Sequence, residues 1–158
     1  MKKYRPNAGI VVFNKDKLVL MCERLIGEEG MSWQFPQGGI EEGETPQEAA
    51  RRELREETSI TSVRFIAQMP HSIIEEFPEE IKAKFAQRGI KTDGQEQYWC
   101  LFLFDGEDSE INLATEEPEF KNWRWDKIEN SDKHVIYFKQ EIYRRLISEF
   151  KPIIENFK

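Results

Sequence analysis

The order of apolar and polar residues along this chain predicts a sheet with helices packed against it. Short apolar runs rich in aromatic and β-branched residues predict strands, and a polar turn at residues 14–17 separates the first two of them. Apolar residues that recur every fourth position predict two amphipathic helices, one over residues 77–85 and a closing one over residues 134–150. We therefore expect a single α/β domain over residues 1–158 with a mixed central sheet. The predicted strands span residues 8–13, 18–22, 63–69, 98–104 and 123–125.

Two polar segments predict irregular structure between these elements. Glu28, Glu29 and Gly30 are typical of a loop. The sequence Pro-Gln-Gly-Gly at residues 36–39 predicts a break in regular structure, and residues 42–44 continue the loop.

The sequence after this loop predicts the start of a third helix. Thr45 is a suitable N-cap, Pro46 suits the first helical position, and Glu48 completes a capping box. We expect this helix to end near Glu57, because Thr58 is a poor helix residue and the chain then becomes extended.

Three glutamates on this helix are the main candidates for chemistry. Glu53, Glu56 and Glu57 are spaced i, i+3, i+4, so their carboxylates share one helix face, and Glu44 adds a fourth acid nearby. Mg²⁺ binds through a few carboxylates together with substrate phosphates, and it would relieve the repulsion among them. The alternative is an ordinary solvated helix face, because runs of charge are common on helices.

A longer pattern around these glutamates resembles the signature of the Nudix hydrolase family. It reads Gly38-x5-Glu44-x7-Arg52-Glu53-Leu54-x-Glu56-Glu57-x-Ser59-Ile60. The resemblance implies an α/β/α sandwich, structural roles for Arg52 and Glu44, and metal ligation by Glu53, Glu56, Glu57 and a backbone carbonyl of Gly38 or Gly39. Ser59 stands where the family has a glycine in the left-handed conformation, so we expect Ser59 to distort the helix exit.

Further blocks resemble the RNA pyrophosphohydrolases of that family, which are also described as dinucleoside oligophosphate hydrolases. The resemblance implies cleavage at the 5′-triphosphate or diphosphate end of RNA, or asymmetric hydrolysis of diadenosine tetra- or pentaphosphate. It assigns substrate contacts to Arg5, Arg24, Ser32, Gln37, Phe138 and Lys139. The blocks are Tyr4-Arg5-Pro6-Asn7-x-Gly9, Trp33-Gln34-Phe35-Pro36-Gln37-Gly38-Gly39, Pro118-Glu119-Phe120-x-x-Trp123-Arg124-Trp125 and Phe138-Lys139-x-x-x-Tyr143-Arg144-Arg145.

The mechanism expected from this resemblance uses Mg²⁺, or Mn²⁺ in its place, to bridge the carboxylates and the phosphates and to activate a water molecule. A carboxylate then takes the proton, and the candidates are Glu57, Glu56 and Glu119. Glu119 resembles a loop glutamate of those enzymes that approaches the metals. The expected catalytic set is Glu53, Glu56, Glu57 and Glu119, and Gly38 joins these four in the metal site.

Other interpretations of these residues stay open. Phe138 also lies on the apolar stripe of the closing helix, Arg24 follows a strand as surface charges often do, and Glu119 belongs to an acidic run. The alternative functions are a module that binds nucleotides without cleaving them and a scavenger of damaged nucleoside triphosphates. Intact Glu53, Glu56 and Glu57 favour catalysis over binding alone.

Composition and net charge limit the kinds of molecule that this chain is expected to bind. The formal net charge of −7 argues against a broad basic face that coats DNA or RNA, but leaves room for recognition of one phosphorylated end. Cys22 and Cys100 lie in apolar runs and are expected to be buried thiols. No stretch is long and apolar enough to span a membrane, so we expect a cytoplasmic protein. The sequence does not indicate an oligomeric state.

Overall fold

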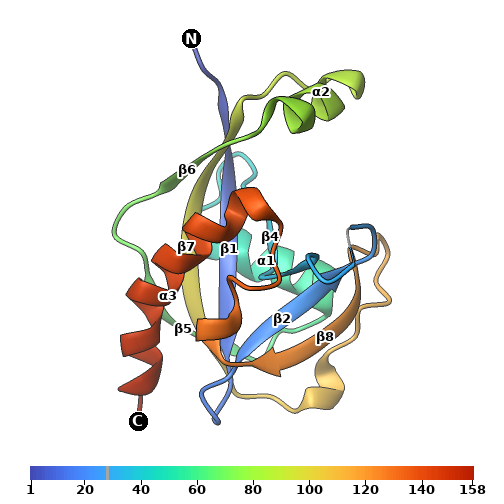
Figure 1. Cartoon of the computed structure of the whole chain (residues 1–158). Coiled ribbons are helices and arrows are strands. Elements are labelled where there is room, and N and C mark those ends of the chain that lie inside the picture. The colour runs from blue at the N-terminus through green and yellow to red at the C-terminus, as the bar shows by residue number, and fades with distance from the viewer. Residues whose placement is uncertain (28) are drawn as a thin grey trace.

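The computed structural model describes residues 1–27 and 29–158, so the loop predicted at Glu28 lies outside the described residues (Figure 1). The chain forms one mixed sheet, three α-helices and short 3₁₀ turns within this part. The helices are α1 (Pro46–Thr58), α2 (Glu79–Gln87) and α3 (Gln140–Glu155). The strands are β1 (Tyr4–Phe13), β2 (Val19–Arg24), β3 (Trp33–Gln34), β4 (Gln37–Gly39), β5 (Val63–Gln68), β6 (Ile73–Glu76), β7 (Gly94–Phe104) and β8 (Phe120–Asp126).

The sheet is built around β1 and β7, which run parallel and pair over ten residues from Tyr4 to Phe13. The remaining pairings are antiparallel, and the main strand order is β3-β2-β1-β7-β5. Strand β4 pairs with β1, β6 with β7, and β8 with β2. The mixed sheet expected from the sequence is therefore confirmed.

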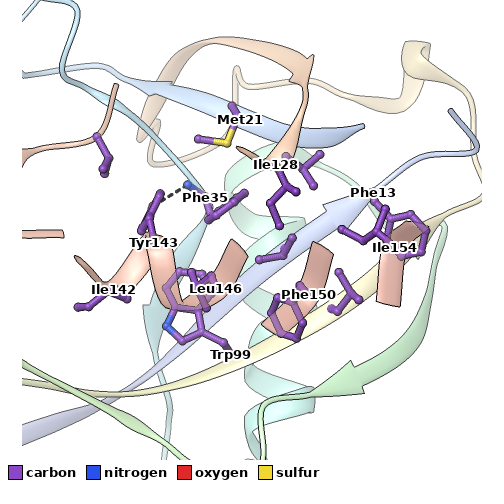
Figure 2. Close-up of a cluster of buried hydrophobic side chains, with 14 of the residues drawn as sticks. Phe13, Met21, Phe35, Trp99, Ile128, Ile142, Tyr143, Leu146, Phe150 and Ile154 are labelled. Carbon is purple, nitrogen blue, oxygen red and sulfur yellow. Dashed lines mark hydrogen bonds between the residues drawn. The ribbon is translucent and has the colours of Figure 1, made fainter. Parts of the chain in front are cut away.

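Side chains that alternate along the strands enter two separate apolar cores. On one face, α1 packs Ala49, Ala50 and Leu54 against the sheet. On the other face, α3 contributes Ile142, Leu146 and Phe150, among others, and Figure 2 shows this core with Phe13 and Trp99 of the sheet. Figure 1 shows α3 in front of the sheet and α1 behind it. This arrangement is the expected α/β/α sandwich, and its cores hold both cysteines as buried free thiols.

One contact across the α3 core fixes the chain next to β4. The Phe35 backbone N–H donates to the Tyr143 hydroxyl at 2.9 Å, and the two rings stack with centroids 4.9 Å apart (Figure 2). Phe35 immediately precedes Pro36 and β4. The last helix therefore holds the backbone from which Gln37 and Gly38 project.

The structure corrects several predicted elements. Residues 36–39 do not simply break regular structure, because Gln37–Gly39 pairs with β1 as β4. The closing helix begins at Gln140 rather than at His134: residues 131–135 form a turn and bends, the His134 carbonyl accepts the Trp33 N–H at 3.0 Å, and Phe138 lies on the 3₁₀ turn Tyr137–Lys139. Strand β6 has no counterpart among the predicted strands. Its inward positions are Ile73 and the charged Glu75, so the usual apolar alternation is broken.

No helix in the described part of the chain is long and apolar enough to cross a membrane.

Candidate active site

Helix α1 begins as the sequence predicts. The Thr45 hydroxyl accepts the Glu48 N–H at 3.1 Å, and the Glu48 carboxylate accepts the Thr45 N–H at 2.9 Å. These two bonds satisfy donors that a helix start otherwise leaves unpaired. Since Ala49, Ala50 and Leu54 anchor one side of α1 to the sheet, the other side turns its glutamates toward β4.

Arg52 is the charged centre of the first half of α1. Its Nε donates to Glu44 Oε2 at 2.7 Å, and its Nη2 donates to the Gly39 carbonyl at 2.8 Å. Its Nη1 donates to Glu53 Oε1 at 2.8 Å and to Glu56 Oε2 at 3.2 Å. The guanidinium holds the pKa of Glu44 at about 2, and the carboxylates raise the pKa of Arg52. These contacts fit the structural roles that the family resemblance implies for Arg52 and Glu44.

Gly38 lies directly against the Glu53 carboxylate. A methyl group at position 38 would collide with that carboxylate, so any larger residue would force the Glu53 side chain away from β4. Gly38 also pairs with Ala8 of β1 in the sheet. The backbone of β4 and the Glu53 side chain are thus held together in one site.

Glu57 is the most unusual charged group of the site. Its side chain is only 7% exposed, and its Oε2 atom has no hydrogen-bond partner within the described residues. Burial, followed by the charges of Glu53, Glu119 and Glu56, raises the pKa of Glu57 to about 9. Burial also raises the pKa of Glu53. Without a bound cation, such a group does not stabilise the fold, because a buried carboxylate among other carboxylates is costly to ionise.

These acids line one cavity of about 790 Å³. The potential metal ligands that face this cavity are oxygen atoms. Several of them are anionic and one has no hydrogen-bond partner, and such a ligand set fits a hard divalent cation. Within residues 1–27 and 29–158, no three acidic, histidine or cysteine side chains yet converge as the shell of a single ion. Arg52 instead draws Glu53 and Glu56 toward itself. The cavity is lined by Gln37, Gly38, Gly39, Glu53, Arg55, Glu56, Glu57, Ser59, Thr115, Glu116, Glu117 and Glu119.

The helix exit is regular, contrary to the distortion expected from Ser59. Ser59 itself adopts the left-handed conformation, with φ 68° and ψ 4°, and its N–H donates to the Arg55 carbonyl at 2.9 Å. The Ser59 hydroxyl donates to the Asn112 carbonyl at 2.8 Å. The serine therefore closes the helix in the left-handed conformation that a glycine would adopt, and its hydroxyl bonds to a different segment.

The predicted substrate residues fall into two groups around this cavity. Arg5 is exposed on β1 and lines a second cavity of about 210 Å³, which shares Gln37, Gly38 and Gly39 with the first. Arg24 is exposed at the end of β2, and its N–H donates to the carbonyl of the buried Ser32 at 2.9 Å. The structure therefore brings Gln37 next to the carboxylates, leaves Arg5 in the neighbouring cavity, and places Arg24 beside Ser32.

Phe138 and Lys139 lie on a turn that faces β6 and α2. The Phe138 ring is partly exposed and lies 6.5 Å from the Phe77 ring, edge to face. Lys139 is only 9% exposed, and its ammonium lies 3.0 Å from both carboxylate oxygens of Glu75 and 3.5 Å from Gln37 Oε1. Burial lowers the pKa of Lys139, while Glu75 opposes this effect. Lys139 thus reaches the substrate side only through the Gln37 amide.

Sequence reasoning missed several residues that line or support the site. Arg55 is the only cationic side chain among the described residues of the large cavity. The sequence could have indicated it, because Arg55 lies three residues after Arg52 and so on a neighbouring part of the same helix face. Glu75 gave no signal, because a buried ion pair between β6 and a distant turn has no local pattern. Thr115, Glu116 and Glu117 belong to the acidic run that contains Glu119, and only the fold shows that this run forms a wall of the cavity.

Comparisons with known proteins agree with this geometry. The family model described as NUDIX domain matches residues 3–146. An RNA pyrophosphohydrolase of Erythrobacter litoralis is 39% identical over 155 residues, which cover 96% of this chain and 93% of the relative. Another RNA pyrophosphohydrolase, from Sphingopyxis alaskensis, is 41% identical over 153 residues, which cover 96% of this chain and 95% of the relative.

The fold is also similar to solved structures. The E. coli dihydroneopterin triphosphate pyrophosphohydrolase superposes with a TM-score of 0.68 at 21% identity, over 93% of this chain and 99% of that chain. At this identity the likeness concerns the fold alone, and it supports the α/β class.

Proposed function

The chain belongs to the NUDIX family of hydrolases, and on that premise we propose that it is a metal-dependent RNA pyrophosphohydrolase. It would cleave the 5′-triphosphate or diphosphate end of RNA to leave a 5′-monophosphate. The observation that carries this proposal is the buried carboxylate of Glu57, which has a partnerless oxygen and faces three other acids beside Gly38. The similarity to RNA pyrophosphohydrolases extends over almost the whole chain and supports the choice of substrate.

The metal-binding residues in this proposal are four acids and one backbone carbonyl. Members of the family use divalent metal ions, and we propose Mg²⁺, with Mn²⁺ as a substitute. When bound, such an ion supplies positive charge to the phosphates and activates water for attack at phosphorus. The residues that would hold it are Glu53, Glu56, Glu57, Glu119 and the carbonyl of Gly38.

The protein's own groups orient the substrate along the cavity. Arg5 lines the second cavity and Gln37 lines both cavities, so we place the nucleoside end in the second cavity. Arg55 lines the large cavity near the end of α1, where it can neutralise the terminal phosphate. Arg52 keeps Glu53 in place against β4, and the proton is taken by Glu57, Glu56 or Glu119.

Asymmetric cleavage of a dinucleoside polyphosphate is the second candidate. Such a molecule presents the same unit of a nucleoside followed by a phosphate chain, and the two cavities, which share Gln37, Gly38 and Gly39, could hold its two parts. We also propose a cytoplasmic location, because the buried Cys22 and Cys100 stay reduced there and the fold needs no disulfide.

The decisive experiment offers several substrates in parallel to the purified protein. These are 5′-triphosphate RNA, 5′-diphosphate RNA, diadenosine tetraphosphate and simple nucleoside triphosphates, each with Mg²⁺, with Mn²⁺ and with EDTA. We expect 5′-monophosphate RNA to form with either ion and not with EDTA. Preference for diadenosine tetraphosphate would favour the second candidate, and reaction with simple triphosphates alone would refute both.

A further inference from the structure

The end of α1 is bonded to the segment that forms the opposite wall of the cavity. We name residues 112–119 the acidic segment, because they carry Glu116, Glu117 and Glu119. The Ser59 hydroxyl donates to the Asn112 carbonyl at 2.8 Å, and the Asn112 N–H donates to the Thr58 carbonyl at 2.9 Å. Two hydrogen bonds therefore join the start of the acidic segment to the helix that bears Glu53, Glu56 and Glu57.

The acidic segment has little structure of its own. Residues 112–119 contain no helix or strand, and the bond from the Ala114 N–H to Asn112 Oδ1 at 2.9 Å lies within its first turn. At the far end, the Glu119 carbonyl accepts the Leu25 N–H at 2.9 Å. The segment is thus fixed at its two ends, and Thr115, Glu116 and Glu117 form the cavity wall between them.

Ser59 supplies a bond that the residue of the family signature lacks. With φ at 68°, position 59 is in the left-handed region, where glycine is unstrained and a residue with a Cβ is disfavoured. A glycine would therefore close α1 at least as well, but it has no hydroxyl for the Asn112 carbonyl. The serine stabilises the position of the acidic segment rather than the helix end itself.

We propose that Ser59 is a positioning residue that holds the acidic segment, and with it Glu119, against the carboxylates of α1. The inference rests on the proposed function, because Glu119 matters only if the cavity binds metal and phosphate. Glu119 lines the same cavity as Glu53, Glu56 and Glu57. With one of the two bonds at the start of the segment removed, Glu119 would depend more on its own carbonyl bond to Leu25, and its carboxylate would face the helix carboxylates less often.

The test replaces Ser59 by glycine, which removes the hydroxyl and relieves the backbone. We expect kcat for 5′-triphosphate RNA to fall by about threefold to tenfold, the factor typical of one neutral hydrogen bond, with little change in KM. The melting temperature should stay the same or rise, so a lower kcat is not a loss of folding. Amide hydrogen exchange without substrate or metal should become faster in residues 112–117 and not in α1 before residue 56. Ser59→Ala should show the same faster exchange, and Thr61→Ala, which removes a neighbouring exposed hydroxyl, should change neither measurement.

A double-mutant cycle tests whether Ser59 acts through Glu119. If it does, Ser59→Gly should cause no further fall in kcat once Glu119→Gln is present. Equal effects in the two backgrounds, or unchanged kcat and unchanged exchange in Ser59→Gly, would overturn the inference. The exchange measurement needs no substrate, so a wild-type protein inactive on RNA would refute the proposed function without deciding the role of Ser59.

Discussion

The two halves of helix α1 carry similar numbers of charged side chains but place them in opposite electrostatic environments. At the first half, the capping box pairs Thr45 with Glu48, and Arg52 is bonded to Glu44 and the Gly39 carbonyl. At the second half, Glu57 is buried without a cationic partner among other acids. The bonds in the first half stabilise the folded chain, whereas the buried acid in the second half destabilises it in the absence of a bound cation. One helix thus combines a stable frame with a site that is unstable by itself.

Replacing Glu57 should reveal the difference between the two halves of α1 with the largest effect. In Glu57→Gln the amide cannot ionise, so we expect turnover to fall by more than roughly a hundredfold, because a charged oxygen ligand is lost. The melting temperature of the metal-free protein at neutral pH should rise, because folding must keep the buried Glu57 protonated and a neutral amide carries no such cost. Steady-state kinetics and thermal unfolding in EDTA measure both effects. Near-normal turnover would remove Glu57 from the site.

The pH dependence of stability should also differ between the two ends. The pKa of Glu57 is about 9 in the folded protein against an ordinary value of 4.5, so folding favours its protonated form. Its contribution is fully present below pH 4.5 and is lost as the pH rises toward 9, by on the order of a few kcal/mol. Glu44, with a pKa of about 2, behaves oppositely: its contribution is present above pH 4.5 and is lost as the pH falls toward 2.

Thermal unfolding in EDTA between pH 6 and about 9 measures the Glu57 contribution as the difference between wild type and Glu57→Gln. We expect the wild type to lose stability relative to the variant over this range, and Mg²⁺ to reduce that loss. Parallel curves for the two proteins would contradict the raised pKa.

Replacing Arg52 tests the stable end. Arg52→Ala removes the bonds to Glu44, Glu53 and the Gly39 carbonyl, and we expect the free energy of unfolding to fall by roughly 1–3 kcal/mol. Urea unfolding measures this change. Arg52→Lys serves as the control, since it keeps the charge without the planar fork and should recover only part of the loss. Unchanged stability in Arg52→Ala would mean that the network contributes nothing.

The smallest expected effect concerns Arg55, the cation at the otherwise acidic end. Arg55→Ala should raise KM for 5′-triphosphate RNA by about threefold to tenfold and change stability little, because one exposed charge–phosphate contact is lost. Arg51→Ala is the matched control, since Arg51 is on the same helix but bonds to the Val63 carbonyl instead of lining the cavity. Equal KM values for the two variants would exclude a phosphate contact by Arg55.

How much the sequence predicts depends on how local each signal is. The capping box and the spacing of Glu53, Glu56 and Glu57 lie within one helix, so the sequence predicts α1 and its acidic face correctly. The buried ion pair of Glu75 and Lys139 joins residues 64 positions apart and gives no periodic pattern, so β6 is missed. Phe138 is assigned to a helix because its spacing to Ile142 is helical, but the preceding chain forms a turn and bends, and its His134 carbonyl is bonded to the distant Trp33 N–H. Gln37 and Glu119 line one cavity and Arg5 lines the next because of sheet pairing, which spacing along the chain does not encode.

The parallel pairing of β1 with β7 has a consequence for how the chain is made. Tyr4 pairs with Gly94, and Phe13 with Leu103, so the parallel partner of the first strand is synthesised about 90 residues later. At ordinary translation rates this delay is roughly 5 to 20 s. During that time the apolar residues 8–13 can pair with β2 and β4 but not with β7, and late contacts of this kind slow folding. A chaperone that covers this strand during synthesis should therefore raise the yield of soluble protein.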